Sequence, residues 1–174
     1  KIIPQIQYAS DLAADASGHI AAVTSSGDLF LMQGEKITDQ INSLDGNVYH
    51  TSCFFDHTGN LYVGTDQSEV KVYSVVDDML KLDHVISLKN MSAINRIYET
   101  DNQELFFCTE NGIAYKKENS EIHYISSGSF NSSIDNMTVD YQGNLWFCSS
   151  RLGIMKMCPS AFSELYPEVG LSEN

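Results

Sequence analysis

Short hydrophobic runs alternate along the whole chain with clusters of Gly, Asn, Asp and Ser. The runs are rich in Val, Ile, Tyr and Phe, which β-strands favour, and turn residues separate them at intervals of roughly eight to twelve residues. This spacing is too short for helices and matches strands joined by tight turns. The pattern therefore predicts an all-β protein.

One motif recurs within this pattern. It reads DASGHIAAVTS from Asp15, DHTGNLYVGTD from Asp56 and DYQGNLWFCSS from Asp140, with an altered version, TDNQELFFCTE, from Thr100. The apolar residues that follow the four turns are Ile20, Leu61, Leu105 and Leu145, so the steps are 41, 44 and 40 residues. A period near forty is typical of β-propeller blades or of helical arrays, and the strand-like runs favour blades.

Each repeat divides into four strand-like runs, so we expect four-stranded antiparallel blades. In the second repeat the strands are expected at His50–Asp56, Leu61–Thr65, Val70–Val75 and His84–Leu88. The whole chain, 1–174, is then one β-propeller segment, with blades at about 9–46, 48–89, 93–126 and 133–167, and the start of a further blade at 168–174. The fourth blade's last strand is expected at 161–167.

The recurring motif has a physical explanation as a turn. An aspartate at the first position accepts hydrogen bonds from backbone N–H groups further on, and Gly near the end tolerates the positive φ that closes a hairpin. The strand after the turn carries aromatic and branched residues that suit packing between blades. We expect Trp146, the single tryptophan, to pack in this way.

Composition narrows the range of partners. The chain has 10 Lys and Arg against 23 Asp and Glu, a net charge of −13 that repels nucleic acid and anionic lipid. No apolar run reaches the eighteen or so residues of a membrane helix, so we expect no membrane insertion by this segment. Because the chain starts at Lys1 without a methionine, we interpret it as part of a longer polypeptide.

The sequence offers no pattern for a metal or cofactor. Cys53, Cys108, Cys148 and Cys158 lack CxxC spacing and are expected to be free, packed thiols, with Cys108 and Cys148 at the same repeat position. The acidic pair Asp77-Asp78 lacks the alternating oxygen ligands of a calcium loop. We therefore expect no metal site and no cofactor.

The fourth repeat, GNLWFCSSRLGIMKMCPSAFSELYPEVGLSEN, resembles the two-component regulator propeller repeat. The resemblance is also strong in the second repeat, at Asp56–Tyr73, moderate in the third, at Glu104–Lys117, and weak in the first, at Asp15–Gln33. It implies a propeller of about seven blades in the extracytoplasmic sensor region of a bacterial membrane signalling protein. In such proteins a histidine kinase or diguanylate cyclase is the output, and the propeller itself is not catalytic. The remaining blades of the same protein would then be partners of this segment.

Propellers usually bind ligands at one end of the central channel, beside the innermost strands. Counting back from the post-turn residues places Asp11, Ser52, Arg96 and Asn136 at equivalent positions, preceded by Ser10, Thr51, Asn95 and Asp135. Hydroxyl, carboxylate and amide groups suit a small-molecule, glycan or peptide ligand, and Arg96 suits an anion. The candidate ligand-binding residues are Asp11, Ser52, Asn95, Arg96, Asp135 and Asn136.

Two other functions stay open at this point. A propeller lyase or hydrolase could use Arg96, Asp135 or His50, although no motif of a known hydrolase or metalloprotease occurs in the chain. A scaffold would instead bind proteins through its surface. The sequence also leaves open whether the chain forms a homodimer.

Overall fold

The computed structural model describes residues 2–117, 120–125, 130 and 132–158. They form four small antiparallel sheets arranged as propeller blades, which confirms the predicted all-β class. The only helical element in these residues is a 3-10 turn, η1 (Ser43–Asp45). The strands are β1 (Ala9–Ala14), β2 (His19–Thr24), β3 (Leu29–Gln33), β4 (Lys36–Ile41), β5 (His50–Phe55), β6 (Leu61–Thr65), β7 (Glu69–Val76), β8 (Met79–Ser87), β9 (Ile94–Glu99), β10 (Leu105–Thr109), β11 (Gly112–Lys116), β12 (His123–Ile125), β13 (Asn136–Val139), β14 (Leu145–Ser149) and β15 (Gly153–Met157).

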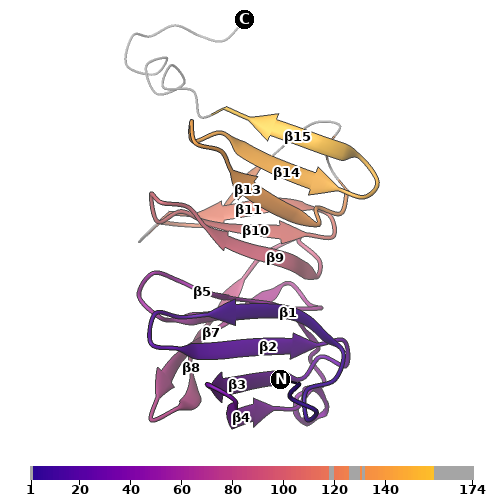
Figure 1. The fold of residues 1–174 in the computed structure, drawn as a ribbon. Coiled ribbons are helices and arrows are strands. Elements are labelled where there is room, and N and C mark those ends of the chain that lie inside the picture. The colour runs from indigo at the N-terminus through magenta and orange to yellow at the C-terminus, as the bar shows by residue number, and fades with distance from the viewer. Residues whose placement is uncertain (1, 118–119, 126–129, 131, 159–174) are drawn as a thin grey trace, which may run out of the picture.

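The blades lie in a row in sequence order (Figure 1). We call the sheets blade 1 (β1–β4), blade 2 (β5–β8), blade 3 (β9–β12) and blade 4 (β13–β15). The first strands β1, β5, β9 and β13 contact one another in succession and are therefore the inner strands. Blades 1 and 4 lie at opposite ends of the row.

The fourth strand of blade 2 is longer than the sequence predicts, beginning at Met79 and not at His84. Asp77 and Asp78 have φ of 52° and 60°, so they form a two-residue hairpin turn in which both residues have positive φ. This turn pairs Val76 directly with Met79 and extends both strands. The predicted last strand of blade 4, at 161–167, lies outside the described residues.

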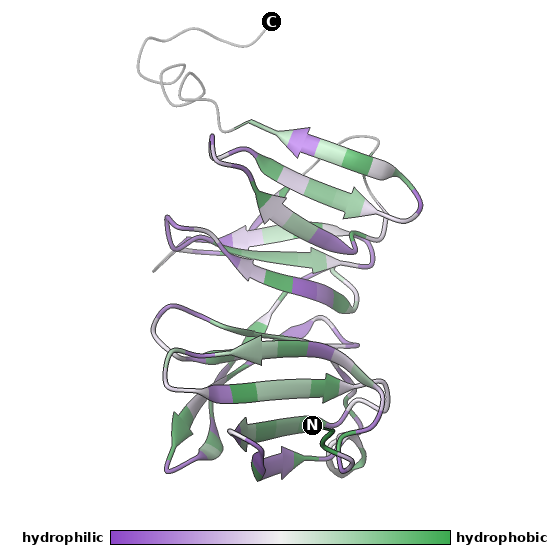
Figure 2. Cartoon of the chain, viewed as in Figure 1, coloured by the Kyte–Doolittle hydropathy of each residue, from purple (hydrophilic) through white to green (hydrophobic). Residues whose placement is uncertain are grey.

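Three hydrophobic clusters fill the spaces between blades, because alternate residues of each strand point to opposite sheet faces. Blades 1 and 2 meet through residues such as Leu31 and Leu61, blades 2 and 3 through Val72 and Phe107, and blades 3 and 4 through residues such as Phe147. Figure 2 shows the matching pattern, with hydrophobic residues along the strands and mostly hydrophilic residues in the turns. Each blade therefore buries its apolar side chains mainly against its neighbours.

The outer face of blade 1 is covered by the residues that precede β1. Ala22, Phe30 and Met32 are buried there, and Ile3 and Ile6 pack against them. The segment before the first strand thus shields an apolar sheet face that no other blade of the described chain covers.

The recurring turn has the predicted chemistry in three of its four copies. In each, one carboxylate oxygen of the aspartate accepts two backbone N–H groups at 2.8–2.9 Å. The glycines at the end of these turns have φ of 81° to 90°. In the altered copy Thr100 accepts one N–H, from Glu104 at 3.3 Å, and Gln103 has a φ of 61°. The turns fix where β2, β6, β10 and β14 begin.

All four cysteines are free thiols, as predicted. Cys53 and Cys108 are buried, and burial raises the pKa of the Cys108 thiol to about 12. Cys148 and Cys158 are exposed, so the expectation of packing is wrong for these two. Cys148 is exposed because it lies on the face of blade 4 that no described residue covers.

Candidate functional site

Equivalent polar residues lie along the inner strands. Asp11 pairs with Val23, Ser52 with Gly64, Arg96 with Cys108 and Asn136 with Cys148 across each first strand pair. The register therefore places the four side chains at the same position in successive blades, as the sequence repeat predicts. Their partners differ from one blade to the next.

Asp11 and Arg96 are brought together although they are 85 residues apart in sequence. The Arg96 Nη1 donates to the Asp11 Oδ1 at 3.1 Å, and the side chains are 32% and 16% exposed. The other oxygen of Asp11, Oδ2, accepts the backbone N–H of Cys53 in blade 2 at 2.9 Å. The Asp11 carboxylate thus connects the inner strands of three blades.

The guanidinium of Arg96 keeps unused hydrogen-bonding capacity. Its Nε is buried and has no hydrogen-bond partner among the described residues, and the ion pair uses Nη1. An arginine carries five N–H donors in a planar fork, so one carboxylate contact leaves several donors at a partly exposed group. Arg96 can therefore hold an anion in addition to Asp11, although the Asp11 charge weakens that attraction.

Other candidate residues on the inner strands bind the next blade. Thr51 and Ser52 both donate a hydroxyl hydrogen to the carbonyl of Ile94 in blade 3, at 2.6 and 3.2 Å. The Asn95 Nδ2 donates to the Ile134 carbonyl, in the segment that leads into β13, at 3.0 Å. These side chains connect neighbouring blades. The sequence does not reveal this role, because the repeat does not specify which part of the next blade each inner strand faces.

Asp135 and Asn136 bind within their own blade. The Asp135 Oδ2 accepts the Ser150 N–H at 2.6 Å, and this hydrogen bond lowers the pKa of the Asp135 carboxyl below its ordinary value. The Asn136 Oδ1 accepts the N–H of Met137 at 2.8 Å. The Asn136 side chain is exposed, so its amide has room for a further partner.

His50, a candidate for the alternative enzymatic function, is almost completely buried, with 3% of its surface exposed. Its Nδ1 lies 2.7 Å from the Gly27 carbonyl in blade 1, which assigns the proton to that nitrogen. Its Nε2 is buried without a hydrogen-bond partner among the described residues. Burial lowers the pKa of the imidazole below its ordinary value. A buried, neutral histidine here joins blades 1 and 2 and does not face a channel.

The described part of the chain holds no group of three or more His, Cys, Asp or Glu side chains placed to bind a metal ion. Within the same residues, no helix has the length and apolar character needed to cross a membrane.

These features define a β-propeller segment with a polar cluster on its inner strands. No protein-family model matches the sequence, and no curated protein matches it.

Solved structures do resemble it. The extracellular domain of a hybrid two-component system from B. thetaiotaomicron has a TM-score of 0.72 and 17% identity over 92% of this chain. PorZ, a surface component of the type-IX secretion system of Porphyromonas gingivalis, has a TM-score of 0.66 and 15% identity over 88%. The mitotic checkpoint complex includes a chain with a TM-score of 0.66 and 13% identity over 86%.

The chain spans only part of each of these structures, at 23%, 25% and 46% of their lengths respectively. At identities this low the similarity establishes the fold alone. The comparisons therefore show the propeller architecture.

Proposed function

We propose that this chain is an extracytoplasmic, non-catalytic sensory segment that binds a hydroxylated anion at the inner strands. The observation that carries the proposal is the Arg96 guanidinium, which is positioned by Asp11, is partly exposed and uses only its Nη1 in the ion pair. The partly exposed pair can be approached by a solute, whereas the hydroxyls of Thr51 and Ser52 are already bonded to Ile94.

The chemistry of the site indicates the class of ligand. A carboxylate or sulfate suits the planar donors of Arg96. Hydroxyl groups of the same molecule suit the exposed amide of Asn136, at the equivalent position of the adjacent inner strand. An acidic sugar or a hydroxy acid combines both features. A simple inorganic anion lacks the hydroxyl groups and would bind more weakly.

The cellular setting is inferred from similarity. The extracellular domain of a hybrid two-component system supports an extracytoplasmic sensory role, and the secretion-system component supports a position at a bacterial surface. The resemblance of the repeats to the two-component regulator propeller points in the same direction. A histidine kinase or diguanylate cyclase as the output belongs to this proposal.

A thermal-shift screen tests the binding step. Glucuronate, citrate and a short peptide with a free carboxylate are the probes, and glucose is the neutral control. A ligand that binds the folded state raises the melting temperature. At a ligand concentration one hundred times the dissociation constant, the added stability is about 2.7 kcal/mol. We expect the acidic probes to raise the melting temperature and glucose to leave it unchanged.

The two arginines of the sequence supply a matched pair of variants. Arg96→Ala removes the proposed anion-binding group, while Arg151→Ala removes an exposed arginine in the turn between β14 and β15. The shift caused by glucuronate or citrate should disappear in Arg96→Ala and persist in Arg151→Ala. Persistence of the shift in Arg96→Ala would show that the anion binds elsewhere.

A further inference from the structure

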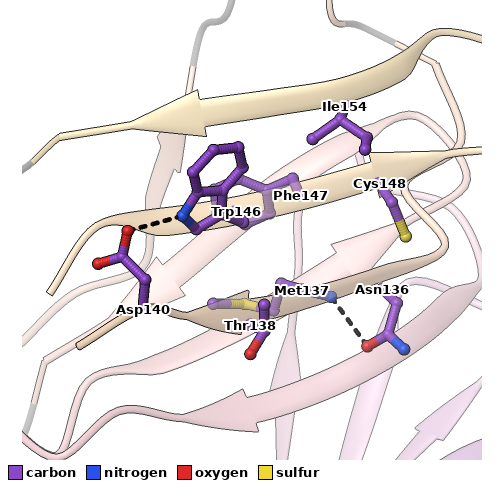
Figure 3. Close-up of a pocket in the computed structure, with 8 residues that line it drawn as sticks. All are labelled: Asn136, Met137, Thr138, Asp140, Trp146, Phe147, Cys148 and Ile154. Atoms are coloured by element: carbon purple, nitrogen blue, oxygen red, sulfur yellow. Dashed lines mark hydrogen bonds between the residues drawn. The ribbon is translucent and has the colours of Figure 1, made fainter. Parts of the chain in front are cut away.

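The outer face of blade 4 carries an apolar groove of about 520 Å³ (Figure 3). Trp146, Cys148 and Ile154 line it from β14 and β15, with Asn136 and Thr138 from β13. Ile154 is 72% exposed, which is unusual for a large aliphatic residue within a strand. Blade 4 lies at the end of the row (Figure 1), and the groove includes Asn136, which is at the position equivalent to Arg96 in the neighbouring blade 3.

The pairing register identifies this groove as the counterpart of the blade interfaces. Ile154 pairs with Cys148, as Ile113 pairs with Cys108 in blade 3, Val70 with Gly64 in blade 2 and Leu29 with Val23 in blade 1. Those three residues, Ile113, Val70 and Leu29, are at most 1% exposed because each packs against the following blade. Ile154 has the same position and chemistry without that cover.

Trp146, the aromatic residue of the groove, also matches residues that are covered by the next blade in blades 2 and 3. Trp146 occupies the place of Phe106 in blade 3 and Tyr62 in blade 2, and both of these pack toward the next blade. Trp146 is held in its orientation by its Nε1, which donates to the Asp140 Oδ2 at 2.9 Å, and by Lys156, whose Nζ lies 5.1 Å from the ring centroid. The ring is therefore pre-positioned on an open face.

The polar position follows the same rule in two of the three preceding blades, while Arg96, at this position in blade 3, pairs with Asp11 instead. Asp11 and Ser52, at the place of Asn136, each bind the backbone of the next inner strand, through the Cys53 N–H and the Ile94 carbonyl. The Asn136 side chain is exposed, and its one hydrogen bond within the described residues is accepted by its Oδ1 from the N–H of Met137. Its amide nitrogen is a donor available for the same kind of backbone contact.

We infer that this face of blade 4 is the docking surface for a further β-blade of the same polypeptide. The inner strand of that blade lies beside β13 and accepts a hydrogen bond from the Asn136 amide. Its inward side chains cover Trp146, Cys148 and Ile154. This docking surface continues the three blade interfaces and does not involve Arg96. It shares Asn136 with the proposed ligand site, and the Asn136 amide carries two N–H donors, one for each contact.

A pair of register-equivalent substitutions tests this surface. Ile113→Ser in the 174-residue chain should lower the melting temperature by roughly 5 to 15 °C, because it places a hydroxyl and a cavity in a packed interface. Ile154→Ser in the same chain should change it by less than about 1 °C, because the side chain is exposed. In the polypeptide that the complete gene encodes, Ile154→Ser should become about as costly as Ile113→Ser.

Labelling of Cys148 with a maleimide gives a second measurement that does not depend on folding stability. With Cys158→Ser in place, Cys148 should react readily in the 174-residue chain and at least tenfold more slowly in the complete gene product. Equal rates in the two proteins, with Ile154→Ser harmless in both, would overturn the inference. Protection in the 174-residue chain that grows with protein concentration would also overturn it, because a second copy would then be the occupant.

Discussion

Gly64 provides a quantitative test of how closely blades 2 and 3 pack. A Cβ atom built on Gly64 would lie 2.7 Å from the Ile94 Cβ and would collide with the Ser52 Oγ. These distances are shorter than van der Waals contact, so the inner strand β9 would have to move away from β6. Overpacking of this kind costs about 1 to 3 kcal/mol. For a domain of this size that corresponds to a fall in melting temperature of about 2 to 12 °C for Gly64→Ala.

Calorimetry or circular dichroism melting measures the effect, and Gly46→Ala is the matched control. Gly46 has a φ of −128° and no atom within 4 Å of a built Cβ, so its substitution should be neutral or slightly stabilising. Adding Ser52→Ala to Gly64→Ala removes one collision and should recover part of the loss. An unchanged melting temperature for Gly64→Ala would refute the close packing of these two blades.

Three further predictions concern the turns and a buried histidine. Asp56→Ala removes the acceptor of the Thr58 and Asn60 N–H groups and should cost about 1 to 2 kcal/mol in chemical denaturation, whereas Thr100→Ala, which loses one long contact, should cost less. Gln103→Gly replaces a side chain at a φ of 61° and should stabilise the protein by roughly 0.5 to 1 kcal/mol, a result that a lower denaturation midpoint would contradict. His50 has a lowered pKa in the folded protein, so the unfolded chain takes up its proton first and stability should fall as the pH drops from 6.5 toward the folded-state pKa. His50→Asn keeps a donor for Gly27 and does not titrate, so the wild type should lose more stability than this variant between pH 7 and pH 5, and equal losses would contradict the assignment.

His19 contributes pH dependence of the opposite sign, which is why the comparison with His50→Asn is needed. Its hydrogen bond to Asp15 raises the pKa of the imidazole, and Asp78 of blade 2 adds to the effect. The charged form is therefore favoured in the folded protein. Its stabilisation is fully present below the ordinary pKa of 6.5 and is lost as the pH rises through the higher folded-state value. Subtracting the stability of His50→Asn from that of the wild type at each pH removes the contribution of His19, which is the same in both proteins.

The sequence was sufficient to predict the repeat, because turn chemistry and strand alternation are local properties. An aspartate followed three residues later by a glycine, as in Asp56 and Gly59, specifies a tight hairpin in each copy of the motif. The number of residues between copies sets the size of the blade. The start of β8 could not be predicted in this way. Asp77 and Asp78 are charged residues that suit a solvated loop, and only their positive φ values show that they form a tight hairpin turn.

The candidate site was predicted in position but not in role. Register places Asp11, Ser52, Arg96 and Asn136 at one level, as the repeat implies. Whether such a side chain faces solvent or the next inner strand depends on how two blades are packed, which no local pattern specifies. Ser52 is consequently an interblade contact, and Arg96 is paired with an aspartate two blades away.

The role of Arg96 is tested most directly by titrating glucuronate into the Asp11→Asn variant in a calorimeter. Asparagine keeps an acceptor for the Cys53 N–H and removes the negative charge 3.1 Å from the Arg96 Nη1. Releasing a partly exposed pair worth about 1 kcal/mol should tighten binding of the anion by about 5-fold. Unchanged or weaker binding in Asp11→Asn, with Arg96→Ala binding as well as the wild type, would contradict a ligand site at this arginine.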